Sequence, residues 1–483
     1  GHLPVVKYLV EENNVNIEEK GQNGLTCLIW ACYSGHLPVI KYLVEERNAN
    51  VDENTHNGDT CLIWASNNGL LPVVKYLVEE GNANIEETNH NGDTCLLLAC
   101  INGHLPVVKY LVEERNADVE VTNHNGDTCL IWACHNDHLP VVKFLVEERG
   151  ANIEEKDHNG LTCLMGTCQI GHLPVVKYLV EERGANIGEK CLNGFSCLML
   201  ACCDGRLPVV KYLVEEKNTN IEEKNDNGDT CLLLACYNGH LPVVKYLVEE
   251  NNVNIEEKGQ NGLTCLIWAC YSGHLPVIKY LVEERNANVD ENTHNGDTCL
   301  IWASNNGLLP VVKYLVEEGN ANIEETNHNG DTCLLLACIN GHLPVVKYLV
   351  EERNADVEVT NHNGDTCLIW ACHNDHLPVV KFLVEERGAN IEEKDHNGLT
   401  CLMGTCQIGH LPVVKYLVEE RGANIGEKCL NGFSCLMLAC CDGRLPVVKY
   451  LVEEKNTNIE EKNDNGDTCL LLACYNGHLP VVK

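Results

Sequence analysis

The sequence predicts an all-α repeat solenoid, and two observations indicate it. A unit of 34 residues, seen between Asn57 and His90, recurs along the whole 483-residue chain. Each unit holds two short apolar segments with helical spacing, set apart by glycine and proline. One pair of such helices cannot bury its apolar face, whereas stacked pairs share a continuous core. We therefore expect helix-turn-helix units with hairpin-like turns between them.

The unit at 57–90 illustrates the expected elements in order. Asn57-Gly58 suits a tight hairpin-like turn, because both residue types tolerate positive φ. Thr60 is the predicted N-cap of a short first helix over 61–68, and Gly69 is suited to end that helix. Pro72 marks the start of a second helix, where its missing N–H costs little. The apolar stripe expected on this second helix consists of Val73, Val74, Leu77 and Val78.

Three segments of the unit resemble the ankyrin repeat. Gly58-Asp59-Thr60-Cys61-Leu62 with Ala65 is similar to the family pattern G-x-T-P-L-H-x-A, and GHLPVIKYLVE from Gly35 to Glu45 is similar to the family's second helix. Gly150-Ala151-Asn152-Ile153 is similar to the loop that follows. The resemblance covers all 483 residues. It implies an ankyrin-like fold and a binding scaffold, but it does not identify a partner.

The units depart from the ankyrin pattern in three ways, none of which changes the expected fold. Cysteine replaces the usual proline at the start of the first helix, as in Cys27, Cys61 and Cys95. An apolar residue, such as Ile63, replaces the usual histidine. The loop after the second helix carries one extra residue, so the period is 34 residues rather than about 33.

A second, longer period defines the expected domain organisation. Residues 1–245 read identically to residues 239–483, a shift of 238 residues, which is 7 × 34. We expect a single uncapped solenoid over 1–483, with a first seven-unit block at 1–238, an identical second block at 239–476 and the start of a third at 477–483. Solenoids normally end in polar capping units, and neither end of this sequence reads as one.

The identity of the two blocks favours a structural protein, namely a filament or fibre built from an end-to-end array. A head-to-tail contact that does not close generates a filament, and one very long chain would do the same. The sequence is equally well read as an arbitrary window on a longer array. The residues expected at an end-to-end contact are Leu3, Val5, Val6, Leu470 and Leu471.

The alternative function is a soluble adaptor that binds a protein partner. The resemblance places two sets of variable positions on the concave face, where ankyrin-repeat proteins commonly bind, although drift explains the variation equally well. The residues at these positions are Asp59 and Phe195 after the turn, and Tyr33, Asn67, Ile101, His135 and Gln169 near the end of the first helix.

Composition limits the partners. The formal net charge of −35 argues against nucleic acid and leaves basic proteins or divalent cations open, although a solvated acidic face explains it equally simply. No apolar run is long enough for a membrane span. The expected partners are therefore further copies of the chain or other proteins. The cellular location is not defined: reduced-looking cysteines favour the cytoplasm, and an extracellular fibre stays open.

No pattern in the sequence indicates catalysis, a cofactor or a metal site. The 30 cysteines lack a C-x-x-C pair, and we interpret them as small core residues, with equivalent cysteines of adjacent units about 10 Å apart and beyond disulfide reach. His36, His104, His138 and His172 lie at the turn between helices, and we expect structural hydrogen bonds from them. Trp30, Trp64 and Trp132 are expected to pack in the core or on the inner face rather than to form a ligand cage.

Overall fold

The protein folds into pairs of short helices, as the sequence predicts. The computed structural model describes residues 1–13, 15–259 and 261–482. Within these ranges it has 29 α-helices and no strand longer than an isolated bridge. The chain divides into two compact units, Gly1–Ala235 and Cys236–Lys483, whose boundary lies three residues before the predicted block boundary, 238 − 235 = 3. A single solenoid over the whole chain stays a prediction.

The first helix of each repeat begins and ends at the residues that the sequence indicates. The Thr60 hydroxyl accepts a hydrogen bond from the Ile63 amide at 3.3 Å, and Gly69 follows the helix with φ +68°. The first helices are α2 (Cys27–Tyr33), α4 (Cys61–Asn67), α6 (Cys95–Ile101), α8 (Cys129–His135), α10 (Cys163–Ile170), α12 (Cys197–Cys203), α14 (Cys231–Tyr237), α16 (Cys265–Ser272), α18 (Cys299–Asn305), α20 (Cys333–Ile339), α22 (Cys367–His373), α24 (Cys401–Ile408), α26 (Cys435–Cys441) and α28 (Cys469–Tyr475).

The second helix of each repeat begins at leucine, with proline at its second position, where no intrahelical N–H is needed. The second helices are α1 (Leu3–Asn13), α3 (Leu37–Lys41), α5 (Leu71–Glu79), α7 (Leu105–Lys109), α9 (Leu139–Lys143), α11 (Leu173–Lys177), α13 (Leu207–Lys211), α15 (Leu241–Glu249), α17 (Leu275–Lys279), α19 (Leu309–Glu317), α21 (Leu343–Lys347), α23 (Leu377–Lys381), α25 (Leu411–Lys415), α27 (Leu445–Lys449) and α29 (Leu479–Val482).

Ten second helices continue into a π-helical turn, which the sequence did not lead us to expect. Each of these turns is followed by arginine or lysine, whereas α5, α15 and α19 precede Gly81, Asn251 and Gly319 and stay α-helical. The π-helical segments are η1 (Tyr42–Glu46), η2 (Tyr110–Glu114), η3 (Phe144–Glu148), η4 (Tyr178–Glu182), η5 (Tyr212–Glu216), η6 (Tyr280–Glu284), η7 (Tyr348–Glu352), η8 (Phe382–Glu386), η9 (Tyr416–Glu420) and η10 (Tyr450–Glu454).

The basic residue after the π-helical turn joins consecutive second helices. The Nε of Arg47 donates to the Tyr42 hydroxyl at 2.8 Å, and this hydroxyl donates to Glu11 of the preceding repeat at 3.2 Å. Arg47 also forms an ion pair with Glu11 at 3.2 Å. The same three-residue link recurs at Tyr110 with Arg115 and Glu79. It therefore adds a polar connection to the apolar contact between stacked repeats.

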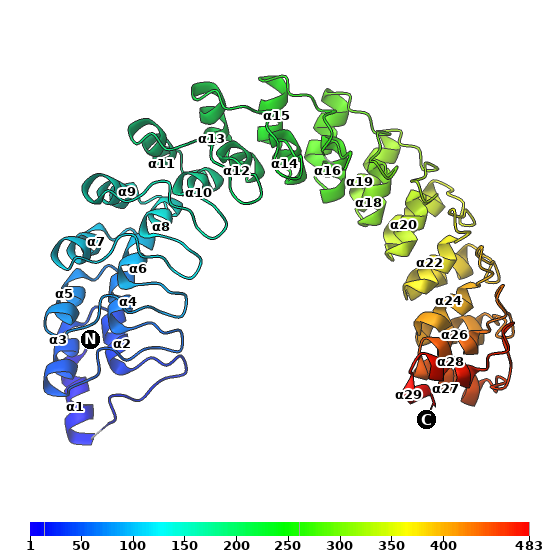
Figure 1. The fold of residues 1–483 in the computed structure, drawn as a ribbon, viewed down its shortest axis with the longest axis horizontal. Helices are drawn as coiled ribbons and strands as arrows, with labels where there is room; N and C mark the ends of the chain where they lie inside the picture. The colour runs from blue at the N-terminus through cyan, green and yellow to red at the C-terminus, as the bar shows by residue number, and fades with distance from the viewer. Residues whose placement is uncertain (14, 260, 483) are drawn as a thin grey trace. The chain divides into compact units, whose positions relative to one another are not determined.

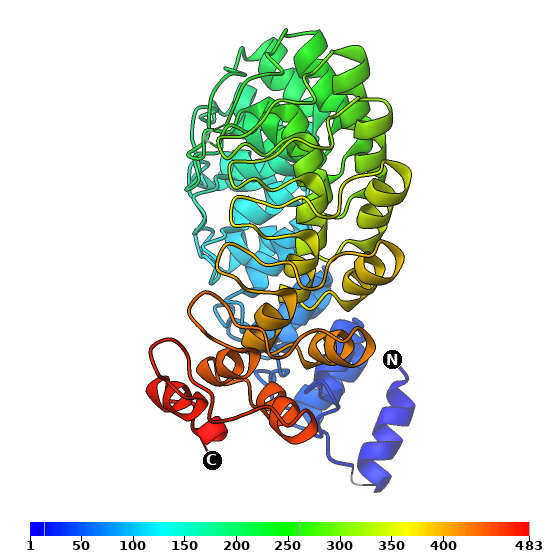
Figure 2. The same ribbon diagram turned by 90° about the vertical axis from the view of Figure 1, so that its right-hand side faces the viewer.

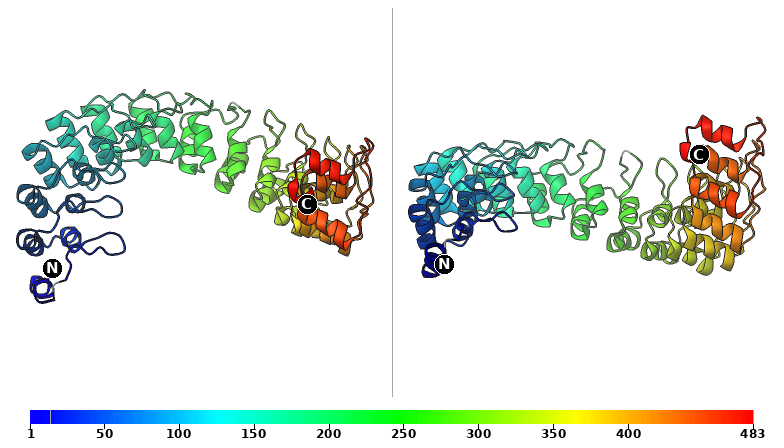
Figure 3. Two further views of the ribbon diagram at one scale, coloured as in Figure 1. Left: turned by 60° about the horizontal axis from the view of Figure 1, so that its bottom comes forward. Right: turned by 90° about the horizontal axis from the view of Figure 1, so that it is seen from below.

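Each repeat packs against the next through like elements. In the first unit α2 packs on α4, α4 on α6 and α6 on α8, while α5 packs on α7 in a second row; both rows can be followed in Figure 1. The second unit repeats this arrangement from α16 to α28, and its orange and red helix pairs are seen stacked in Figure 3. Leu62, Ile63 and Leu77 are at most 1% exposed, so the core is a continuous layer between the two rows.

Cysteine thiols meet within this core at the junctions between repeats. The second cysteine of one first helix lies near the first cysteine of the next, and the neighbouring Cys32 thiol raises the pKa of Cys61. Burial, together with the neighbouring Cys129 and Cys163 thiols, raises the pKa of Cys100 and of Cys134 in the same way. These are non-equivalent positions of adjacent repeats, a pairing that the sequence comparison of equivalent cysteines missed. None of the cysteines forms a disulfide, and most are buried, as the interpretation as core residues requires.

The turns between repeats are hairpin-like, as predicted. Thr88 and Thr94 form an isolated antiparallel bridge across the turn, where Gly92 has φ +82°. Successive turns also contact each other, because the His124 amide donates to the Asn91 carbonyl at 2.9 Å. In Figure 2 the turns project beyond the first helices. No helix in the described ranges is both long and apolar enough to cross a membrane.

Candidate protein-interaction surface

The side chains that vary between repeats lie on one surface, which we call the first-helix face. It consists of the outward edges of the first helices and the tips of the turns that precede them. Tyr33 is exposed there, and six further predicted positions are half-buried: Asp59, Asn67, Ile101, His135, Gln169 and Phe195. All seven are therefore at least partly accessible. Nothing in the structure shows which of them binds a partner.

Aromatic side chains pack edge to face along this surface. The Tyr33 ring lies 5.7 Å from Trp30 and 5.2 Å from Trp64, measured between ring centroids. Farther along, Trp132 packs against His135 at 5.2 Å. The tryptophans thus lie on the first-helix face, and Trp30 is 53% exposed. In the second unit Trp268, Tyr271 and Trp302 form a similar row. Such half-exposed rings are typical anchors of protein contacts.

A ladder of asparagine and aspartate side chains joins the turns below the aromatic row. The Asn89 amide donates to the Asp59 carboxylate at 3.0 Å, and Asn123 donates to Asp93 at 3.1 Å. Each asparagine uses its side-chain oxygen to accept backbone N–H groups of its own turn; Asn123 accepts from the Asp127 amide at 3.0 Å. The side-chain amide of each asparagine is then free to donate to the carboxylate of the preceding repeat. An acidic residue is therefore tolerated in the turn.

The ladder ends at Asp127, because the next turn has Asp157 where the earlier turns have asparagine. Asp157 accepts backbone N–H groups from Asn159 at 2.9 Å and from Leu161 at 2.8 Å, as an asparagine would. Its second carboxylate oxygen accepts from the side-chain amide of Asn159 at 3.4 Å, so Asp157 has no donating amide of the kind that Asn123 directs at Asp93. Two carboxylates thus replace a hydrogen-bonded pair. The second unit repeats this with Asp365 and Asp395.

A cavity of about 340 Å³ opens beside these two carboxylates. Asp127, Trp132, His135, Asp157, Gly166 and Gln169 are among the residues that line it. Gly166 stands where other first helices have leucine or tryptophan, and a Cβ there would meet nothing within 4 Å. The equivalent cavity of the second unit has about 320 Å³ and includes Gly404. Both volumes lie in the range of ligand-binding pockets, on the order of 300–1,000 Å³.

A third cavity shows what Gly166 and Asp157 contribute. It lies beside Asp297 and Trp302 in the second unit, with Leu336 in place of glycine and Asn327 in place of the second aspartate, and it has about 200 Å³. There the Asn327 amide donates to Asp297 at 2.9 Å. The same elements therefore form a smaller pocket with a satisfied carboxylate.

Burial and nearby charges shift two pKa values in the Asp127 pocket. Burial raises the pKa of Asp127 above its ordinary value, a hydrogen bond from the Asn123 side chain lowers it in part, and the nearby Asp157 and Asp93 carboxylates raise it. Burial lowers the pKa of His135, with a smaller contribution from His172. The neutral imidazole therefore does not offset the two carboxylates near neutral pH.

The histidines between helices make structural hydrogen bonds, which confirms the prediction for His104, His138 and His172 but not for His36. The Nε2 atoms of His104, His138 and His172 lie 2.9–3.0 Å from the carbonyl oxygens of Asn67, Ile101 and His135 in the preceding repeats. They tie consecutive repeats together at the end of the first helix. Across the described ranges, no group of three or more histidine, cysteine or acidic side chains is arranged to hold a metal ion.

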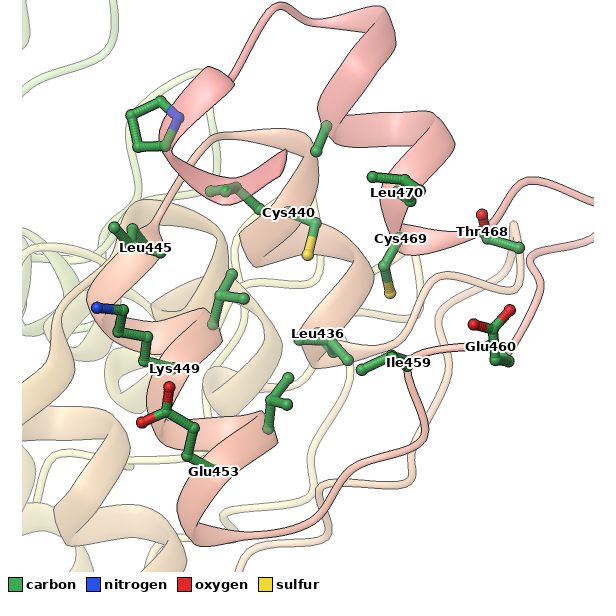
Figure 4. A pocket seen from close by; sticks show the side chains of 15 residues that line it. Leu436, Cys440, Leu445, Lys449, Glu453, Ile459, Glu460, Thr468, Cys469 and Leu470 are labelled. Carbon is green, nitrogen blue, oxygen red and sulfur yellow. The ribbon is translucent and has the colours of Figure 1, made fainter. Parts of the chain in front are cut away.

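The residues predicted for an end-to-end contact are only partly exposed. Val5, Leu470 and Leu471 are 56%, 57% and 55% exposed, whereas Leu3 and Val6 are half-buried. Leu470 lines an apolar pocket of about 630 Å³ together with Leu436, Leu445 and Ile459, shown in Figure 4. One repeat earlier, the residues equivalent to Leu470 and Leu471 are Leu436 and Met437, which are 1% and 0% exposed. No contact with another copy is shown.

The residues of the Asp127 pocket were missed at the level of sequence, although a signal was present. Gly166 occurs at its position in only one of the seven different repeats, and Asp157 interrupts a run of asparagines at 89 and 123. Trp132 was assigned to packing alone. Asp127 and Trp132 belong to one turn and its first helix, and Asp157 and Gly166 belong to the next turn and helix. A search for contacts between different positions of successive repeats would have placed these residues side by side.

These features define a helical repeat protein whose variable side chains share one surface. The family model for ankyrin repeats, in three copies, matches residues 1–89, 81–157, 149–225, 216–293, 285–361, 353–429 and 402–483, and so covers the whole chain. The chain belongs to the ankyrin-repeat family. Proteins of this family are generally non-enzymatic scaffolds for protein interactions. No curated protein matches the sequence.

Proposed function

We propose that this protein is an ankyrin-repeat scaffold that binds a protein partner along its first-helix face. The observation that carries the proposal is the arrangement of partly exposed aromatic side chains, such as Tyr33 and Trp30, beside a pocketed row of turns. The second helices present a different surface, on which charges are already paired, for example Lys75 with Glu114 at 3.3 Å. Aromatic anchors next to pockets are typical of the residues that dominate binding energy.

The charge of the chain favours a basic partner. With a formal net charge of −35, the protein attracts positively charged segments and speeds their association. A basic, extended segment would lie across several turns, because each repeat adds only one row of side chains. Its affinity would come from the aromatic side chains and pockets, and its orientation from the turns.

Selection of peptides from a displayed random library on the full 483-residue protein tests this function. The enriched peptides are measured by fluorescence anisotropy against two face variants, each made in both blocks: Tyr33→Ala with Tyr271→Ala, and Ile101→Asp with Ile339→Asp. The control is Lys41→Ala with Lys279→Ala, on exposed positions of the second helices.

We expect at least one face variant to weaken binding tenfold or more, since a central anchor contributes about 2 kcal/mol. The control should stay within twofold. Failure to enrich any peptide, or peptides that respond only to the lysine control, would refute the proposal.

A second candidate function is self-assembly into a filament. The observation that favours it is the identity of residues 1–245 with residues 239–483, since an array of identical blocks can be continued by further blocks. In a head-to-tail contact, Val5 and its neighbours in one copy would meet Leu470 and Leu471 in the next. Negative-stain electron microscopy should then show filaments that the double variant Leu470→Asp, Leu471→Asp abolishes. Discrete particles at all concentrations would exclude this candidate.

A further inference from the structure

We propose that the pocket between Asp127 and Asp157, and its counterpart between Asp365 and Asp395, each bind an arginine side chain of a basic protein partner. The inference rests on the proposed scaffold function and specifies the chemistry of the partner at one position in each unit. Three properties of the pocket lead to it: its unbalanced carboxylates, its shape and the identity of its walls.

Asp127 lacks the donor from the next turn that the earlier aspartates have. In those turns an asparagine amide satisfies each aspartate, as Asn123 does for Asp93 at 3.1 Å. Asp157 removes that donor and adds a negative charge, while Asp127 is only 9% exposed and so has little access to water. A buried carboxylate beside a second, half-buried one is costly unless a counter-charge or a proton joins it. A guanidinium would restore the missing donor and offset one of the two charges.

The shape of the pocket suits a flat group rather than a compact one. Gly166 leaves space beside Trp132 where the cavity at Trp302 has Leu336, and the two cavities measure about 340 and about 200 Å³. A guanidinium is planar, stacks on aromatic faces and donates through two N–H groups to a carboxylate. Its methylene stem would lie against the apolar parts of Trp132 and Leu161, both of which line the cavity.

Two other cations fit less well. A lysine ammonium is strongly hydrated and donates from one point, so it would satisfy one carboxylate and leave the aromatic wall unused. A divalent metal needs more ligands than the pocket offers, since the described residues provide no cluster of three acidic, histidine or cysteine side chains. His135 also lines the pocket, and its lowered pKa leaves it uncharged beside an incoming cation.

The test uses the full protein and the peptides enriched on it. In each peptide the arginine is replaced in turn by citrulline, which keeps the shape but not the charge, and by lysine. The protein variants, each made in both blocks, are Gly166→Leu with Gly404→Leu, which fills the pocket, and Asp157→Asn with Asp395→Asn, which restores the ladder. Leucine occupies the same position at residues 98 and 336, so the filling variant retains the fold.

The matched control is Asp93→Asn with Asp331→Asn. These aspartates hold the same place in the ladder as Asp127, but each already accepts an asparagine amide. We expect citrulline to weaken binding at least tenfold and lysine to weaken it less. Both pocket variants should weaken the arginine peptide at least tenfold and remove its preference over citrulline, while the control stays within threefold.

The outcomes separate the inference from the scaffold function. Peptides that bind the first-helix face but tolerate citrulline, or that lose as much affinity in the Asp93 control as in the pocket variants, would overturn the arginine assignment alone. Failure to enrich any peptide would overturn both. Binding that needs arginine but survives both pocket variants would show that arginine is recognised elsewhere and would also refute the inference.

Discussion

Asp157 has a carboxylate oxygen in place of the amide that, one repeat earlier, Asn123 donates to Asp93 at 3.1 Å, and its charge helps to raise the pKa of Asp127. The backbone of the two turns is otherwise bonded alike, since Asp157 and Asn123 both accept the N–H groups of their own turns. One atom, oxygen instead of nitrogen, therefore converts an attractive contact into a repulsive one. This relationship leads to measurable effects on stability.

Replacing the second aspartate should stabilise the protein. Asp157→Asn with Asp395→Asn restores a hydrogen bond to Asp127 and Asp365 and removes a pair of like charges, a gain of about 1 kcal/mol per site. Urea unfolding followed by circular dichroism measures the gain. The reverse change, Asn123→Asp with Asn361→Asp, should destabilise the protein by a similar amount. Equal stability of all three proteins would show that the two carboxylates do not interact.

The effect of Asp127 on stability should depend on pH. The folded protein holds the pKa of Asp127 above its ordinary value of 3.8, so the folded state binds that proton more tightly than the unfolded state. Stability contributed by the protonated form is therefore present below the ordinary pKa and is lost as pH rises through the raised pKa. Asp127→Asn with Asp365→Asn should thus stabilise the protein at pH 7 and change little near pH 3.5. A difference independent of pH would contradict this assignment.

Thiol reactivity should follow burial. Burial raises the pKa of Cys95 to about 12, so almost none of it is thiolate at pH 8. In the native protein a thiol reagent such as Ellman's should react quickly with no more than the exposed and half-buried cysteines, which are Cys27, Cys191, Cys203, Cys429, Cys441 and Cys474.

After denaturation without reductant, all 30 cysteines should react. A lower total would reveal disulfides and contradict the interpretation of the cysteines as reduced core residues. Fast reaction of all thiols in the native protein would instead show that the paired thiols at the repeat junctions are accessible.

A single hydroxyl should strengthen the contact between second helices. Phe144 stands where Tyr178 and Tyr42 stand in other repeats, and Arg149 and Glu113 already form an ion pair beside it at 3.0 Å. Phe144→Tyr with Phe382→Tyr should complete the three-residue link and raise stability by about 0.5–1.5 kcal/mol per site. The matched variant that removes the hydroxyl is Tyr110→Phe with Tyr348→Phe, and it should lower stability. Differential scanning calorimetry checks both, and a tyrosine that lowers stability would show that the hydroxyl does not fit.

The elements within one repeat could be predicted from the sequence because their signals are local. The roles of Thr60, Gly69 and Pro72 follow from backbone chemistry that involves only neighbouring residues. Contacts between repeats were predicted less well. The cysteines were compared at equivalent positions, whereas Cys32 meets Cys61, which is 29 residues away rather than 34, 61 − 32 = 29. The pocket was missed for the same reason, since Asp127 and Asp157 are 30 residues apart.

Gly166 lacks the side chain that other repeats have at its position, and Asp157 has a charged oxygen where Asn123 has a donating amide. In the neighbouring turns Asn89 and Asn123 already donate to the preceding aspartates, so these turns leave no such position for a ligand. A binding pocket can thus form in this array where a repeat lacks groups that the other repeats have. Only two substitutions in one repeat are needed, and they lower the local stability that those groups provide in the other repeats.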